Sequence, residues 1–169
     1  MNIKEKLINS SEEKYGDDYK KTIFEQYKLY VEMADRISSR RQIANEFFLS
    51  INTILIALVG YSGIISPTVF PAYLNLIVAA AGMILCFTWF RIIRSYKDLN
   101  TAKFNVIHEI EKLLPLSPCA AEWEAVDRGT NSKLYLPFTH IEIKIPWIFF
   151  SLFALAFLLK IIFFFVPCK

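Results

Sequence analysis

The chain has 169 residues, of which 54% are hydrophobic and 15% aromatic, with a formal net charge of +3. So small a positive charge, with no recognition motif, argues against nucleic acid as a partner. The three cysteines, Cys86, Cys119 and Cys168, have no CxxC spacing, and no structural disulfide is expected. The first residues are not followed by an apolar stretch, so we expect no cleaved signal peptide.

Residues 1–18 are rich in Lys, Glu, Ser and Asp and are predicted to be a flexible or loosely helical tail. Residues 19–46 are predicted to form a cytoplasmic amphipathic helix, because apolar residues recur there every three or four positions. The recurring positions are Ile23, Tyr27, Tyr30, Ala34, Ile37, Arg41 and Ala44. The spacing is that of heptads, but two or three heptads are short for a coiled coil with another subunit, so we favour packing against the chain's own helices over that alternative.

Three apolar runs predict three membrane spans, at residues 47–65, 72–90 and 146–166. The first two contain no charged residue, and each is close to the roughly 20 residues that cross the hydrocarbon core as a helix. A small loop, residues 66–71, joins them. The sequence therefore predicts an all-α membrane protein with three transmembrane helices.

Basic residues predict the orientation of these spans. Three arginines precede the first span and four basic residues follow the second, whereas the 66–71 loop has no charge. The positive-inside rule then places the N-terminus and the segment between the second and third spans in the cytoplasm. The third span would run outward, with the C-terminus on the periplasmic or extracellular side.

Small and polar residues in the first two spans are candidates for helix packing and oligomerisation. They are Asn52, Gly60, Asn75, Ala79 and Gly82. Small residues allow helix backbones to approach closely, and asparagine can form hydrogen bonds between helices. For the two asparagines we favour such structural bonds over the alternative, a polar pathway.

Lys160 is the only charged residue in the third span. It lies about six residues, or ~9 Å, from the outer end, a distance that a lysine side chain can bridge by snorkelling. The alternative is a ring of Lys160 side chains around a pore or an interface. We favour snorkelling. No acidic residue lies in any span, which argues against a carboxylate proton relay.

Residues 91–114 are predicted to continue the second span as a cytoplasmic helix that forms a stalk with residues 19–46. Its apolar stripe is predicted to contain Tyr96, Leu99, Lys103, Val106, Ile110 and Leu113. Basic residues interrupt the two stripes at Arg41 and Lys103, and the spacing leaves three acids as alternative partners. These are Glu46, Glu109 and Glu111.

Residues 115–145 are predicted to form a cytoplasmic segment with a short helix and loops. Pro115 ends the preceding helix, and Ser117 is predicted to be the N-cap of the short helix that contains Trp123. Further on, Thr139 and Glu142 fit a capping box, whereas alternation in residues 140–145 favours a short strand. Both alternatives stay open before the third span.

No catalytic or metal-binding motif is present. His108 and Glu111 could share a helix face, and His140 lies near Glu142, but two isolated histidines are a weak signal for metal. The sequence has no nucleophile elbow and no glycine-rich phosphate loop. We expect no enzyme activity and no cofactor.

One segment, Trp89–Phe104, together with its continuation to Pro115, resembles the RipA-type octameric membrane-protein family of bacteria. The residues that contribute most to this motif are Trp89, Ser95, Tyr96, Asn100, Lys103, Glu111, Pro115, Glu122 and Trp123, with Thr139, Glu142 and Pro146-Trp147 after them. The resemblance covers Tyr30–Phe150. It implies a homo-octamer of the bacterial inner membrane with no settled activity, some relatives being linked to intracellular growth or conflict systems.

Two functions are therefore weighed. The first is a membrane scaffold or interaction protein whose partners are lipid, copies of itself and a cytoplasmic protein that contacts Trp123. The alternative is a pore or channel, such as an effector of a bacterial defence system, since the layout is also similar to SLATT-type effectors with their two-span hairpin. The third span departs from that simpler plan.

Overall fold

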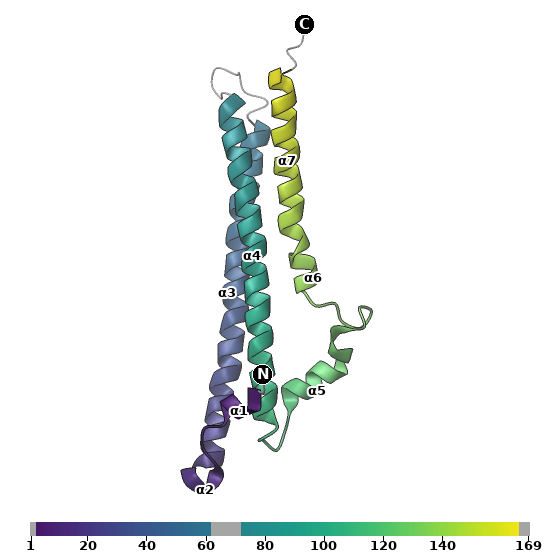
Figure 1. Cartoon of the computed structure of the whole chain (residues 1–169). Coiled ribbons are helices and arrows are strands. Elements are labelled where there is room, and N and C mark those ends of the chain that lie inside the picture. The colour runs from purple at the N-terminus through teal and green to yellow at the C-terminus, as the bar shows by residue number, and fades with distance from the viewer. Residues whose placement is uncertain (1–2, 62–71, 166–169) are drawn as a thin grey trace. The chain divides into compact units, whose positions relative to one another are not determined.

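The structure, a computed structural model, describes residues 3–61 and 72–165, and within these ranges every regular element is a helix (Figure 1). The long helices are α3 (Tyr19–Tyr61), α4 (Ala72–Glu111) and α7 (Lys144–Phe165). The short ones are α1 (Ile3–Leu7), α2 (Glu12–Tyr15), α5 (Pro118–Ala125), the 3-10 helix η1 (Asp127–Gly129) and α6 (Thr139–Glu142). The predicted 66–71 loop and the C-terminal residues 166–169 lie outside the described ranges.

The prediction of three apolar helices is confirmed. Helices α3, α4 and α7 are each long and apolar enough to cross a membrane, with mean hydropathies of 1.7, 2.2 and 2.3 in their most apolar windows. In the third of these helices, Thr139–Ile162, only 11% of the most apolar 18-residue stretch is buried within one subunit. Most of that apolar surface must therefore be covered by lipid or by other subunits, because it cannot remain in water.

The chain divides into two compact units, and α3 and α4 each contribute to both. Unit 1 consists of Met1–Arg40 and Tyr96–Pro137, and unit 2 of Arg41–Ser95 and Phe138–Lys169. Unit 1 contains the polar halves of the two long helices together with α1, α2, α5 and η1. Unit 2 contains the apolar halves of these helices together with α6 and α7.

The buried face of α4 follows a heptad pattern, but its register differs in part from the prediction. Positions that alternate by four and three residues are all buried or half-buried, and they are Asn75, Ala79, Gly82, Cys86, Trp89, Ile93, Tyr96, Asn100, Lys103, Ile107 and Ile110. Leu99 and Leu113, which were predicted to lie in the stripe, are 48% and 39% exposed. The predicted stripe is therefore shifted by one residue at Leu99. Polar Asn100, and not apolar Leu99, lies on the buried face of α4.

The N-terminal tail contains two short helices, and the 139–145 segment is helical from Thr139 to Glu142 and again from Lys144. Helices α1 and α2 lie within this tail. At α6 the amide N–H groups of Glu142 and Ile143 donate to the carbonyls of Phe138 and Thr139. The strand alternative is wrong, because a helix satisfies these backbone groups within the segment, whereas a lone strand would need a partner strand.

Unit 2 has two apolar clusters along the spans. One contains Phe48, Trp89 and Ile93, and the other contains Ala79, Cys86 and Phe153. Each cluster draws residues from at least two of the helices α3, α4 and α7, so all three spans pack together. This packing fixes the position of the polar residues described next.

Candidate functional site

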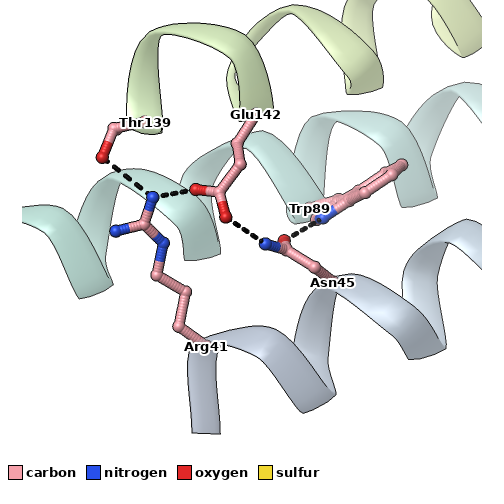
Figure 2. A network of polar contacts seen from close by, with 5 residues as sticks. All are labelled: Arg41, Asn45, Trp89, Thr139 and Glu142. Atoms are coloured by element: carbon pink, nitrogen blue, oxygen red, sulfur yellow. Dashed lines mark hydrogen bonds and ion pairs between the residues drawn. The ribbon is translucent and has the colours of Figure 1, made fainter. Parts of the chain in front are cut away.

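A network of five polar and aromatic residues joins α3, α4 and α6 in unit 2 (Figure 2). Arg41 forms an ion pair with Glu142, and its guanidinium also donates to Thr139 Oγ1 at 2.8 Å. Asn45 lies one turn along α3 from Arg41 and donates from Nδ2 to Glu142 Oε1 at 2.9 Å. Trp89 of α4 completes the network by donating from Nε1 to Asn45 Oδ1 at 2.8 Å.

The network is largely removed from solvent. The side chains of Arg41 and Glu142 are only 15% and 7% exposed, and Trp89 is 2% exposed. The Trp89 ring stacks on Phe48, with centroids 5.9 Å apart and planes 9° apart. A carboxylate removed from water is stable only when charge and hydrogen bonds compensate it, and Glu142 has both. The arrangement therefore fixes α6 against α3 and α4 immediately before α7 begins.

The network corrects two expectations from the sequence. Thr139 does not cap α6: the N-cap is Phe138, and the Thr139 hydroxyl instead accepts from Arg41. Glu142 pairs with Arg41, although it is not among the three acids that local spacing allows as partners. Asn45 is also absent from the residues predicted from the sequence, but its position one helical turn from Arg41, just before an apolar run, is a usable signal.

In the spans, the predicted packing residues differ in their surroundings. Asn52 is fully buried; its Nδ2 donates to the Phe48 carbonyl at 2.7 Å, and its Oδ1 accepts from Cys86 Sγ at 3.2 Å. Asn75 is 2% exposed. Both asparagines thus point into the subunit, and the bond from Asn52 to Cys86 connects α3 with α4.

The two glycines that were expected to aid packing are not equivalent. A Cβ atom added at Gly82 would lie 2.6 Å from the ring of Phe153, so α7 packs directly on this glycine of α4. A Cβ atom added at Gly60 would meet nothing within 4 Å. Gly82 therefore permits close packing of α4 and α7, beside the buried Ala79, whereas Gly60 lies on an open helix surface.

A second buried carboxylate, Glu111, organises unit 1. It is fully buried at the end of α4, where it accepts hydrogen bonds from the backbone amides of Cys119 at 2.8 Å and Ala120 at 3.0 Å. The Tyr27 hydroxyl donates to the same carboxylate at 3.0 Å. Ser117 occupies the N-cap position of α5 without a side-chain capping bond. The predicted serine cap is thus wrong, and Glu111 caps this helix from α4.

The surroundings of Glu111 shift two pKa values in opposite directions. Burial opposes ionisation of Glu111, but the two backbone amides and the Tyr27 hydroxyl outweigh it, so its pKa lies below the ordinary value. For Tyr27, burial together with its bonds to Cys119 and Glu111 raises the pKa. At neutral pH the pair is therefore a carboxylate that accepts from a neutral phenol, and no cation is needed to hold the charge.

The other residues of the predicted motif lie mainly at the surface of unit 1. The Lys103 ammonium lies over the Tyr30 ring, 4.4 Å from its centroid. Trp123 is 40% exposed. A Cβ atom at Gly129 would meet Trp123 and Pro137 at 3.3 and 3.2 Å, so this ring is held beside η1. Ser95, Pro115 and Glu122 are exposed, and Tyr96 and Asn100 are half-buried.

Within the described residues, neither histidine belongs to a cluster that could hold a metal ion. Among the residues that the structure describes, no three His, Cys, Asp or Glu side chains gather closely enough to hold a metal ion. Glu111 and Glu142 instead bond to Tyr27 and Arg41. Lys160, on α7, is half-buried, and no ion pair of this residue occurs in the described part of the chain.

The fold and these sites define a small polytopic membrane protein made of helices, with polar networks inside the subunit. Comparison with family models agrees: residues 24–163 match the Octameric membrane protein family (8xMP). The chain belongs to this family, whose name describes self-assembly of eight subunits. No curated protein and no solved structure matches the chain.

Proposed function

We propose that this protein forms a homo-octamer in the inner membrane of a bacterium, of the RipA type, and that it acts as a non-enzymatic scaffold. Membership of the octameric family supports the number of subunits. The bacterial inner membrane, and a cytoplasmic position for unit 1, rest on the sequence resemblance and on the positive-inside rule.

One observation favours a scaffold over a pore. The two asparagines of the spans are buried inside the subunit, and Asn52 bonds to Phe48 and Cys86 of its own chain. Exposed hydroxyls in the spans behave likewise: Thr53 and Thr88 each donate to a carbonyl one turn earlier in their own helix. Since these groups are already satisfied, the outer surface of the spans offers lipid-like contacts and little to solvate an ion.

The alternative, a pore, is favoured by Lys160. This lysine is half-buried in a span and forms no ion pair within the described residues. A ring of eight such cations could line a path for anions. Snorkelling toward the membrane surface explains the same position without a pore.

Two measurements on the purified full chain test these functions. Native mass spectrometry in detergent should give eight times the mass of the 19.6-kDa chain. Reconstituted liposomes should show no ion flux above that of empty vesicles. Flux that disappears in Lys160→Leu would support the pore and overturn the scaffold.

The scaffold also needs a surface for a partner in unit 1, and the half-exposed Trp123 is the proposed contact. Trp123→Ala should leave the octamer intact. Loss of the octamer in this variant would place Trp123 in the subunit interface and would contradict a role in partner display.

A further inference from the structure

A second feature of unit 2 points to a specific lipid. On the outside of α4 and α7, three aromatic rings form a continuous row of contacts. The rings of Phe90 and Trp147 have centroids 5.4 Å apart, and those of Trp147 and Phe150 are 5.6 Å apart, each pair edge to face. Trp147 is 45% exposed. The row therefore forms part of the apolar surface that α7 leaves uncovered.

Two cations lie at the end of this row. Arg94 follows Phe90 by one turn of α4, and its guanidinium carbon lies 5.8 Å from the centre of the Phe90 ring. Lys144 precedes Trp147 by about one turn of α7. Because the predicted span of α4 ends at Phe90 and the predicted span of α7 begins after Lys144, both cations lie one turn outside the aromatic contact, on the same side of it.

Neither cation is neutralised within the part of the chain that the structure describes. Arg94 and Lys144 are both exposed and have no ion pair there. The acidic residues of unit 2 are Glu46 and Glu142, and Asp98 lies one turn beyond Arg94 on α4, where it is exposed and forms no ion pair with Arg94. Glu142 is bound to Arg41, and Glu46 accepts a hydrogen bond from Gln42 on α3. The surface beside Phe90 and Trp147 is therefore cationic, with apolar rings directly above it.

We propose that Phe90, Arg94, Lys144, Trp147 and Phe150 form a binding site for an anionic phospholipid. The lipid phosphate would lie between Arg94 and Lys144, since guanidinium and ammonium groups both bind phosphate oxygens. The acyl chains would lie along Trp147 and Phe150, and the Trp147 ring would be at the level of the headgroups. Basic side chains between transmembrane helices at a membrane surface are suited to such lipids.

The proposal can be tested by native mass spectrometry of the full chain, titrated with phosphatidylglycerol or with phosphatidylcholine of the same acyl chains. We expect roughly tenfold tighter retention of phosphatidylglycerol, since each surface cation contributes to the attraction. In Arg94→Gln/Lys144→Gln this preference should fall to about onefold. The control Arg36→Gln/Lys112→Gln makes the same change of charge in unit 1 and should keep the preference.

Three results would overturn the site: no preference in the parent protein, an unchanged preference in Arg94→Gln/Lys144→Gln, or an equal loss in the control. Displacement of the lipid by excess inorganic phosphate would show a site for free phosphate and would also contradict the proposal. The same spectra report the mass of the assembly. Failure of the lipid site is therefore distinguishable from failure of the octamer.

Discussion

Each unit of this protein buries one carboxylate, and the two are stabilised in different ways. Glu142 in unit 2 lies beside the Arg41 guanidinium and also accepts from Asn45. Glu111 in unit 1 accepts from two backbone amides and from Tyr27. The Glu142 network links α3, α4 and α6 at the start of a span, whereas Glu111, at the end of α4, accepts from Tyr27 of α3 and caps α5. Glu142 is thus compensated by a cation and by a side-chain donor, whereas Glu111 receives two of its three donors from the backbone at the N-terminus of α5.

The largest expected effect comes from breaking the ion pair of unit 2. Glu142→Leu leaves Arg41 mostly buried without its carboxylate, which should cost about 3–5 kcal/mol of unfolding free energy. The melting temperature in detergent, followed by circular dichroism, measures this loss. The double variant Arg41→Leu/Glu142→Leu should recover most of it. A double variant as unstable as the single one would show that the bonds to Thr139 and Asn45 matter more than the charge.

The second largest expected effect concerns the packing of α4 against α7. Gly82→Ala places a Cβ atom 2.6 Å from the Phe153 ring, and the displacement of α7 should cost roughly 1–3 kcal/mol. Gly60→Ala is the matched control, since its Cβ atom meets nothing within 4 Å. It should be neutral or slightly stabilising. Equal melting temperatures for the two variants would contradict the direct contact between α4 and α7.

Glu111→Gln tests the carboxylate of unit 1. The amide keeps one acceptor oxygen but loses the charge, so we expect a loss of roughly 1–2 kcal/mol at pH 7. Because the folded pKa of Glu111 is lowered, its contribution is complete above the ordinary value of 4.5 and is lost as the pH falls from there toward the folded pKa.

Unfolding of the parent protein and of Glu111→Gln should therefore be compared across this pH window. The stability difference between them should shrink as the pH falls below 4.5. A difference that stayed constant down to the lowest pH would show that folding does not lower the pKa of Glu111.

The smallest expected effect concerns the last bond of the unit 2 network. Trp89→Phe keeps an aromatic ring against Phe48 but removes the donor to Asn45, which should cost about 1 kcal/mol. Trp147→Phe is the control, because Trp147 has ring contacts and no hydrogen bond from its indole N–H among the described residues. A larger loss of unfolding free energy in Trp147→Phe than in Trp89→Phe would contradict this expectation. It would show that the ring contacts of Trp147 stabilise the protein more than the bond from Trp89 to Asn45.

Much of the architecture follows from the sequence. Two uncharged runs and a third with only Lys160 have no stable place except in lipid, so three helical spans follow from hydropathy. Trp89 and Glu111 also belong to the motif that the sequence alone reveals. The exact stripe on α4 does not follow, because Leu99 and Asn100 compete for one inward position and hydropathy favours the leucine.

Only the tertiary structure decided which polar groups meet. Arg41 and Glu142 are 101 residues apart, and Tyr27 and Glu111 are 84 apart. Local spacing offers several acids for the cations, and it offers Ser117 and Thr139 as caps that the structure does not use. The choice between them depends on how α3, α4 and α6 pack, since a buried charge selects the partner that the surrounding helices bring within hydrogen-bonding distance.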